Sequence, residues 1–196
     1  MVISYSRIDA EYTPAEAAVI TGVSTSLQRD WRRRNIIQST AKDGKHTRFK
    51  FNDLCEMFAL KAFSDAGLGV SDMSTRETRT ARVMNGEYDA ESAAHFCLFP
   101  MMYFADQSLV ANGNDRMSTV RTSDPENRIG RYVFVNPKRM FRADSLENVE
   151  RAIAADPDWD PVVTMFDCKT AAEKILARLP RAPYEFVETV TEKKGA

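Results

Sequence analysis

Histidine and cysteine are scarce in this sequence of 196 residues, which contains two histidines and three cysteines. Cys55, Cys97 and Cys168 lie far apart without a paired spacing, so we expect neither a disulfide framework nor a zinc knuckle, and a reducing compartment is favoured. His46 and His95 have no partner ligands at metal-binding spacing. The sequence therefore predicts no metal site and no cofactor.

Long apolar runs are also missing. The longest, HFCLFPMMYFA at 95–105, has about half the length of a membrane helix and contains Pro100. Residues 1–11 are not apolar enough for a signal peptide. We therefore expect a protein without membrane contact that works in the cytoplasm.

Motifs of the common enzyme classes are absent as well. The sequence has no nucleophile elbow, no phosphate-binding glycine loop and no dinucleotide-binding fingerprint. The half of the chain after residue 100 has no histidine, and no constellation of histidine, cysteine or carboxylate residues suggests acid–base chemistry. We therefore predict that the protein is not an enzyme and has no catalytic residues.

Charge is distributed unevenly along the chain. Residues 28–50 carry eight lysines and arginines against two aspartates, a net charge of +6, although the whole chain has a net charge of −1. The rest of the chain therefore carries −7. A basic segment on an otherwise acidic protein is typical of a nucleic-acid contact surface, whereas an arbitrary basic run is more often only a solvated face.

Two short helices are predicted within this N-terminal region. Thr13, Pro14 and Glu16 have the spacing of a capping box with proline at the first helical position. Gly22 can end this helix in the left-handed conformation, and Ser24 can cap a second helix. A helix, a glycine turn and a second helix have the order of a helix-turn-helix.

The second helix has one apolar face and one polar face. Leu27 and Trp31 are four residues apart, so they share a face that we expect to pack inward. The Asp43-Gly44 pair that follows predicts a basic hairpin, and Asn52 or Asp53 can cap a third helix. The opposite face of the second helix carries Thr25, Gln28, Arg29, Arg32 and Arg33.

These residues resemble the DNA-binding domain of the MerR-like winged helix-turn-helix superfamily. The resemblance covers residues 1 to about 75, and Asn35 stands where the family usually has a glycine. It does not extend to the family's dimerising coiled coil or to its cysteine-containing metal loop, because neither a sustained heptad nor such a loop follows. The matching segments are YTPAEAAVITGVS, LQRDW, the Ile36-Ile37 pair, RFKFNDL and AFSDAGLGVSDM.

The rest of the chain predicts a small domain of mixed helices and strands. We expect a helix at 90–99 that ends before Pro100, two strands about a turn at 112–115 within 106–122, and strands at 131–136 and 162–167. Further helices are expected after Ser145, with Leu146, Val149 and Ile153 on one face, and over 169–179. The fold class is thus α+β, with a winged helix-turn-helix domain at 1–85, an α+β dimerisation, effector or partner domain at 86–190, and a disordered tail after Glu188, residues 191–196 in particular.

The resemblance and the charge pattern together favour a sequence-specific DNA-binding transcriptional regulator of bacterial or phage type. The recognition helix at 24–35 would enter the major groove of double-stranded DNA, with Thr25, Ser26, Gln28 and Arg29 near the base edges. Phosphate contacts would hold the register. The full predicted DNA-binding set is Ser24, Thr25, Ser26, Gln28, Arg29, Arg32, Arg33, Lys45, His46, Thr47, Arg48 and Lys50.

Two alternatives use other classes of function. An excisionase, a phage packaging subunit or a nucleoid protein could use the same domain architecturally, and an enzyme could place its active site in the second half. We expect a homodimer, with the contact in the helix that contains HFCLFPMMYF and in the α+β domain, although this helix could equally pack within one monomer. The C-terminal domain could also contact RNA polymerase or another protein.

Overall fold

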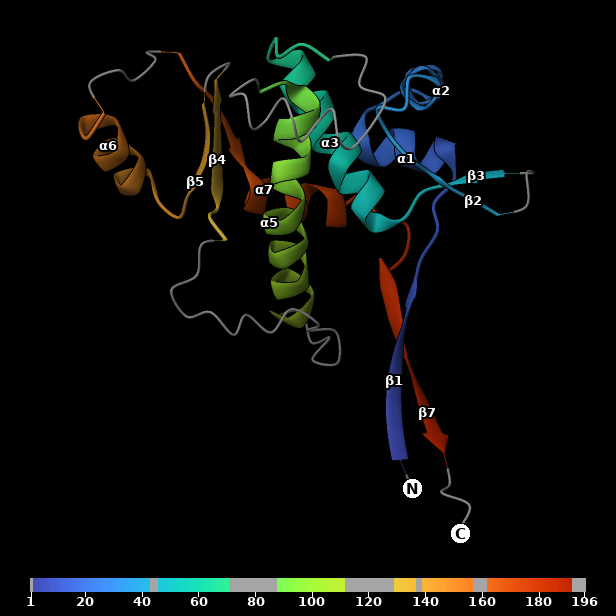
Figure 1. Ribbon diagram of the computed structural model, residues 1–196. Helices are drawn as coiled ribbons and strands as arrows, with labels where there is room; N and C mark the ends of the chain where they lie inside the picture. Colours follow the sequence, from blue (N-terminus) through green and yellow to red (C-terminus); the bar gives the residue numbers. More distant parts are fainter. Residues whose placement is uncertain are drawn as a thin grey trace.

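The computed structural model describes residues 2–42, 46–70, 88–111, 129–136, 139–156 and 162–191 (Figure 1). Helices and strands are mixed, which confirms the α+β class. None of the helices in these ranges is long and apolar enough to cross a membrane. The elements are β1 (Val2–Asp9), α1 (Pro14–Thr21), α2 (Thr25–Arg33), β2 (Thr40–Lys42), β3 (His46–Arg48), α3 (Phe51–Asp65), α5 (Ala90–Ala111), β4 (Tyr132–Asn136), β5 (Arg139–Ala143), α6 (Leu146–Ala154), β6 (Thr164–Asp167), α7 (Cys168–Leu176) and β7 (Tyr184–Thr191).

Helix α1 begins and ends where the sequence predicts. The Thr13 hydroxyl accepts a hydrogen bond from the Glu16 amide at 3.2 Å, and the Glu16 carboxylate accepts one from the Thr13 amide at 2.7 Å. This is the predicted capping box. Gly22 then adopts the left-handed conformation with φ of 76°, which turns the chain toward α2.

The turn after helix α2 contains a residue with an unusual backbone conformation. Asn35 is the only described residue other than glycine with positive φ, at 56°. The Asn35 amide donates to the Arg32 carbonyl, and the Ile36 amide donates to the Trp31 carbonyl at 2.8 Å. These two bonds form a Schellman motif, in which asparagine is the usual substitute for glycine. Asparagine therefore serves at this position as the left-handed residue that ends the helix.

A short hairpin follows α2 and leads into α3. Strands β2 and β3 pair antiparallel, with Thr40 opposite Arg48. Tyr12, just before α1, exchanges two backbone hydrogen bonds with Phe49 at 2.8 and 3.0 Å, which fixes the base of the hairpin against the start of α1. The predicted turn at Asp43-Gly44 lies outside the described residues.

One apolar core joins the two halves of the chain. Helix α3 contacts α1 on one side and packs against α5 and α7 on the other. Its Leu54, Met57 and Leu60 are buried in the same cluster as Met101 of α5 and Ile175 of α7. The predicted domain boundary at 85/86 lies outside the described residues, but residues from both sides of it share this core.

Helix α5 does not end before Pro100, as the sequence predicts, but continues to Ala111. Residues 106–111, predicted as part of a strand, are therefore helical. A proline inside a helix leaves the carbonyl four residues earlier without its donor, here that of Phe96. The Arg142 guanidinium from β5 donates to this carbonyl and lies 3.9 Å above the Phe96 ring. A partner from a distant segment thus removes part of the cost of the proline. The predicted turn at 112–115 and the strand after it lie outside the described residues.

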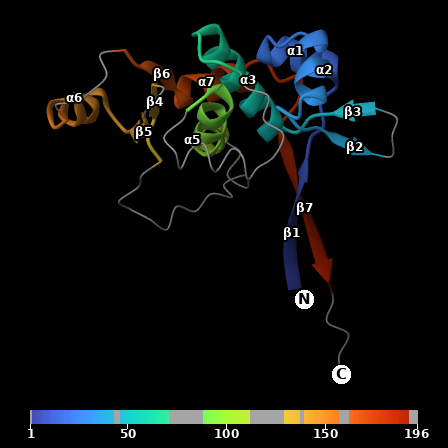
Figure 2. The ribbon, with the colours of Figure 1, turned by 45° about the horizontal axis from the view of Figure 1, so that its top comes forward.

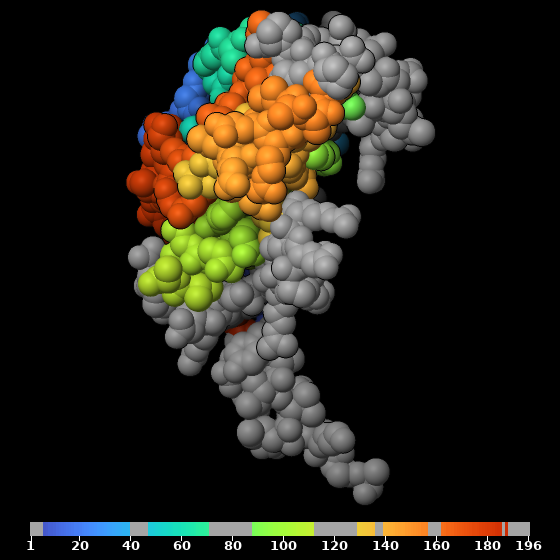
Figure 3. All heavy atoms as spheres, turned by 90° about the vertical axis from the view of Figure 1, so that its left-hand side faces the viewer, coloured from blue at the N-terminus to red at the C-terminus, as the bar shows by residue number. Residues whose placement is uncertain are grey.

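A three-stranded antiparallel sheet with the order β5-β4-β6 flanks this core. The strands predicted at 131–136 and 162–167 are confirmed. Val133 and Val135 join the main core, whereas Phe134 faces a smaller cluster with Val149 of α6. Only Val149 of the predicted apolar face of α6 is buried, because Leu146 and Ile153 remain 52% and 39% exposed. Figure 3 shows α6, in orange, on the surface of the molecule.

The two ends of the described chain pair with each other. Strands β1 and β7 form an antiparallel ribbon of eight residue pairs that projects from the body of the molecule (Figures 1 and 2). Strand β7 extends to Thr191, so the predicted disordered tail is wrong for residues 189–191; residues 192–196 lie outside the described ranges. The sequence patterns did not predict this pairing, because residues 2–9 and 184–191 are separated by most of the chain and the patterns compare only near neighbours.

Arginines just before β7 attach the C-terminal segment to α1. Arg181 pairs with the Glu16 carboxylate at 2.7 Å and lies 4.7 Å from the centre of the Tyr12 ring. Arg178 donates to the Ile20 carbonyl at 2.9 Å. Glu16 thus receives two kinds of donor, the Arg181 guanidinium and the backbone at the capping box. These hydrogen bonds, chiefly that of Arg181, lower the pKa of Glu16 from 4.5 to about 2.

We predict that Glu16→Gln lowers the free energy of unfolding by about 1–2 kcal/mol at pH 7, because a charge-assisted pair with Arg181 is lost while the cap is kept. A depressed folded-state pKa stabilises the protein above the ordinary pKa of 4.5, and this stabilisation disappears as the pH falls toward 2. Urea unfolding at pH 7 and near pH 2.5 should therefore show a difference between variant and parent that shrinks in acid. Glu147→Gln, at an exposed pair with Arg151, is the control and should cost less than about 0.5 kcal/mol. A Glu16→Gln effect independent of pH would contradict this interpretation.

Candidate nucleic-acid interface

Helix α2 presents two distinct faces. Trp31 is 3% exposed and packs in the core, with Leu27 partly buried against it, as predicted. Ser26, Arg29 and Arg33 are exposed, and their spacing of three and four residues places them in one stripe on the outer surface of the helix. Ser24 caps the helix by accepting from the Leu27 amide at 3.2 Å. Thr25 flanks the stripe and is partly buried.

Gln28 belongs to the inner face rather than to the polar one. It is 2% exposed, and its side-chain amide donates to the Pro14 and Val23 carbonyls at 3.0 and 2.9 Å. These bonds join the start of α1, the turn and α2. The structure therefore gives Gln28 a role in fixing the angle between the two helices, and we leave it out of the candidate contact surface, although the sequence placed it near the base edges.

Arg32 connects α2 with the hairpin. Its guanidinium donates to the Thr47 hydroxyl on β3 at 2.6 Å, and Arg48 donates to the Thr47 carbonyl at 3.3 Å. The structure thus brings together Arg32, Thr47 and Arg48, three residues of the predicted DNA-binding set. The Arg32–Thr47 bond also sets the position of the hairpin relative to the helix.

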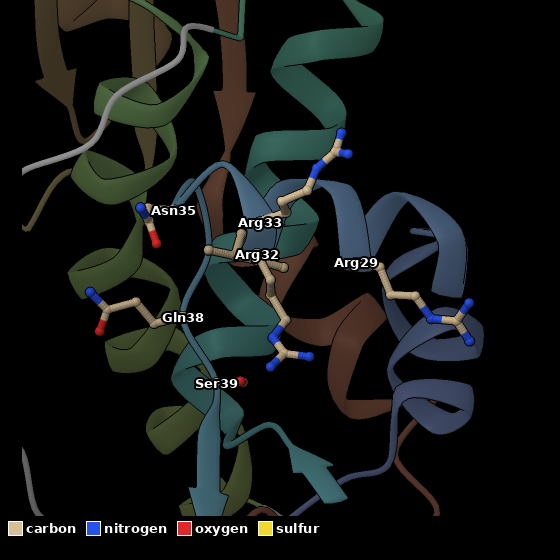
Figure 4. Close-up of a pocket in the computed structure, with 7 residues that line it drawn as sticks. Arg29, Arg32, Arg33, Asn35, Gln38 and Ser39 are labelled. Atoms are coloured by element: carbon tan, nitrogen blue, oxygen red, sulfur yellow. The ribbon is translucent and has the colours of Figure 1, made fainter. Parts of the chain in front are cut away.

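A shallow basic hollow lies where the end of α2 meets the strand leading into β2. Figure 4 shows Arg29, Arg32 and Arg33 leaving the helix in different directions, with Arg32 directed toward the hairpin. The volume of the hollow is about 560 Å³. Three cationic side chains around one hollow favour an anionic partner. The lining residues are Arg29, Arg32, Arg33, Asn35, Ile37, Gln38 and Ser39.

Gln38 and Ser39 were not among the residues selected from the sequence. They follow the buried Ile36 and Ile37 and belong to a polar stretch that the sequence indicated only as the start of a hairpin. Their position beside the arginines depends on the turn at Asn35, which reverses the chain after α2. The polarity of this stretch suggested that its side chains are exposed, but it could not predict that Gln38 and Ser39 lie beside the arginines of α2.

Acidic neighbours reduce the charge at one end of this surface. Asp30 pairs with Arg33 at 2.6 Å and with Arg34 at 3.5 Å. The Arg33 side chain nevertheless remains 81% exposed. Arg29 lies one turn earlier on the exposed stripe and is the arginine of α2 closest to the N-terminus of the helix.

The remaining predicted contacts lie away from the helix. Lys50 pairs with Asp9 of β1 at 3.3 Å, and Arg7 pairs with the same carboxylate at 2.7 Å. Burial raises the pKa of Asp9, but the hydrogen bonds from Arg7 and Lys50 outweigh it and hold this pKa below its ordinary value. Lys45 lies outside the described residues, and only the backbone of His46, in β3, is described.

The three cysteines lie close together in the core, with Cys168 beside Cys97 and near Cys55. Cys55, Cys97 and Cys168 are free and buried, and burial raises the pKa of Cys55 and of Cys97 above the ordinary value. The His95 side chain is 63% exposed, with Glu56 3.8 Å away. Within the described ranges, no three histidine, cysteine, aspartate or glutamate side chains lie close enough together to hold a metal ion.

No description of a known protein family matches this chain, and no curated protein matches it in sequence.

We predict that Trp31→Ala lowers the free energy of unfolding by about 3–5 kcal/mol, because it removes a large buried side chain and leaves a cavity between α2 and its neighbours. Thermal and urea unfolding would measure the loss. Arg29→Ala is the control on the exposed face and should change stability by less than about 0.5 kcal/mol. An unchanged melting temperature for Trp31→Ala together with loss of DNA binding would mean that Trp31 acts on the ligand rather than on the fold.

A second prediction concerns the turn after α2. Asn35→Ala should cost about 1 kcal/mol, because alanine is strained at φ of 56°, whereas Asn35→Gly should cost nothing or stabilise. Gln38→Ala, an exposed change in the same loop, is the control and should be near neutral. Equal unfolding free energies for Asn35→Ala and Asn35→Gly would contradict the assignment of strain to this residue.

Proposed function

We propose that the protein is a sequence-specific regulator of transcription that binds double-stranded DNA through a winged helix-turn-helix. In this proposal α1 and α2 form the helix-turn-helix, α2 is the recognition helix, and the β2–β3 hairpin is the wing. The order of the elements supports this proposal, since a hairpin directly follows α2 and a third helix completes the unit.

One observation carries the proposal: a basic hollow lies where the end of α2 meets the segment leading into β2, and Arg32, which lines it, bonds to Thr47 of β3. A recognition helix needs polar side chains that reach base edges and cations that reach phosphates on either side. Ser26 and Arg29 meet the first requirement, and Arg33 together with the hairpin meets the second. Gln28 and Arg32 support the interface from within, through the hydrogen bonds to the turn and to Thr47.

Residue roles follow from the positions along α2. The N-terminal part of a recognition helix faces the floor of the major groove, so Thr25, Ser26 and Arg29 are the proposed base contacts. An arginine in this position can donate two hydrogen bonds to guanine. Arg33 and Arg48 lie farther along the surface and would contact phosphates, which supply affinity without sequence preference.

The preferred DNA sequence would first be selected from genomic fragments with the full chain. We then predict that Arg29→Ala weakens binding to this sequence by roughly 1–3 kcal/mol and relaxes the preference at one base position, if Arg29 reads a guanine. Arg33→Ala should weaken binding to specific and random duplexes alike, and it should reduce the slope of log Kd against log salt by about one.

Fluorescence anisotropy at several salt concentrations, on the selected duplex and on a random one, would measure both effects. Arg151→Ala, on the exposed surface of α6, is a matched control that removes an arginine away from α2 and the hairpin. Equal behaviour of Arg29→Ala and Arg33→Ala on both duplexes would contradict the proposed division of roles. Absence of DNA binding by the intact chain at low salt would overturn the proposed function.

A further inference from the structure

Within the described residues, the β1–β7 ribbon leaves two strand edges open, the outer edge of β1 and that of β7. Its eight residue pairs run from Val2–Thr191 at the far end to Asp9–Tyr184 at the body. Both views of the fold show the ribbon projecting away from the helices (Figures 1 and 2). Within the part of the chain that the structure describes, β1 pairs with β7 and with no other strand. The outer edge of β1 therefore presents backbone donors and acceptors that another strand could use.

A hydrogen bond at the base of the ribbon shows which residues of β1 direct their backbone N–H and C=O away from β7. The Ala10 amide donates to the Pro183 carbonyl at 2.9 Å, so this facing pair is of the hydrogen-bonded kind. The two kinds of pair alternate along an antiparallel ladder. Ser6 therefore directs its backbone N–H and C=O toward β7. We call outward those residues whose backbone N–H and C=O point away from the other strand of the ribbon. In β1 these are Ile3, Tyr5, Arg7 and Asp9. In β7 they are the residues paired with them, Val190, Glu188, Phe186 and Tyr184.

The two edges of the ribbon differ in charge. Strand β7 carries Glu185 and Glu188 and no cation, so two copies of it would bring four carboxylates together. Strand β1 carries Arg7 and Asp9, which cancel, and its residues 2–6 carry no charge at all. Strand edges that must stay unpaired usually carry lysine, proline or a bulge, and β1 has neither lysine nor proline. The β1 edge is thus the one that a second copy can approach without repulsion.

We propose that two copies of this chain form a dimer by antiparallel pairing of β1 with β1, which produces a four-stranded sheet with β7 on each outer edge. The register that uses all four outward residues of each strand has its two-fold axis at Ser6. In it, Ile3 of one copy faces Asp9 of the other, Tyr5 faces Arg7, and Ser6 faces Ser6. No like charges face each other, and every outward amide and carbonyl from Ile3 to Asp9 obtains a partner.

This surface differs from the one that the sequence suggested. Helix α5, which contains HFCLFPMMYF, buries Cys97, Pro100 and Met101 against α3 and α7 within one monomer. Strand pairing gives an isologous contact, which closes at two copies because the outer edge of β7 repels a further copy. The dimer does not depend on DNA, so its tests and those of the proposed function fail separately.

The first test removes one outward amide from each edge in turn. Tyr5→Pro deletes a backbone donor of the outer β1 edge, and Glu188→Pro deletes the matching donor directly opposite on the β7 edge. Tyr5→Ala controls for loss of the side chain. In sedimentation velocity without DNA, the parent, Tyr5→Ala and Glu188→Pro should be dimers across micromolar concentrations, and Tyr5→Pro should be a monomer with unchanged helix content by circular dichroism. A monomeric parent, a dimeric Tyr5→Pro, or a monomeric Glu188→Pro would overturn the proposal.

The second test is independent of proline and reads the register. Facing residues of a pair that is not hydrogen-bonded have Cα atoms about 4.5 Å apart, within the range of a disulfide. Ser6→Cys should therefore cross-link two copies under glutathione disulfide, which is reduced to two glutathione molecules as the two thiols lose their protons and electrons. Val187→Cys faces the same residue from β7, is 41% exposed, and is the matched control that should remain uncoupled. Non-reducing electrophoresis of the full chain would show a covalent dimer for the first variant alone. The absence of that band, or an equal band for Val187→Cys, would overturn the proposed edge, since the native cysteines are buried.

Discussion

Burial of α3 on nearly all sides is the constraint on which the rest of the structure depends. Leu54, Cys55, Met57, Ala59 and Leu60 are all buried, although they point to different sides of the helix. A helix that is apolar around most of its circumference has to be enclosed by other elements. Helix α1 covers one part of it, and α5 and α7 cover another. The candidate interface and the second half of the chain are therefore held by the same core.

This shared core explains why the candidate interface is fixed by interior residues as much as by exposed ones. Trp31 anchors α2 through apolar packing, and Gln28 ties it to the carbonyls of α1 and the turn. Arg32 then holds the hairpin through Thr47. A recognition surface that is rigid before binding loses less entropy when it binds, so these inward contacts would contribute to affinity without touching DNA.

The attachment of the chain ends has consequences on both sides of α1. Arg181 pairs with Glu16 at the first turn, and Arg178 donates to the Ile20 carbonyl at the last turn. Cations from the C-terminal segment thus support a helix near the N-terminus. The same attachment starts the β1–β7 ribbon, since Ala10 and Pro183 begin its ladder. The β1 edge of the proposed dimer and the proposed recognition helix α2 are therefore both connected to α1.

The sequence by itself determined the features that depend on neighbours a few residues away. The capping box at Thr13, the turn at Gly22, the cap at Ser24 and the inward face of Trp31 are present as predicted, because caps, turns and helix faces require only residues within one or two helical turns. The strand at 131–136 was predictable for the same reason, since its β-branched and aromatic residues favour an extended chain locally.

Only the tertiary structure decided the features that need a distant partner. Helix α5 continues through Pro100 with Arg142 bonded to the carbonyl that the proline leaves without a donor, and residues 189–191 form a strand because β1 lies beside them. Gln28 is polar and on a polar-looking helix face, yet it is buried with its side-chain amide bonded to the Pro14 carbonyl at the start of α1 and to the Val23 carbonyl at the turn. In each case the free energy of a hydrogen bond or of strand pairing comes from a segment that local patterns do not include, and that segment reaches its place only when the whole chain has folded.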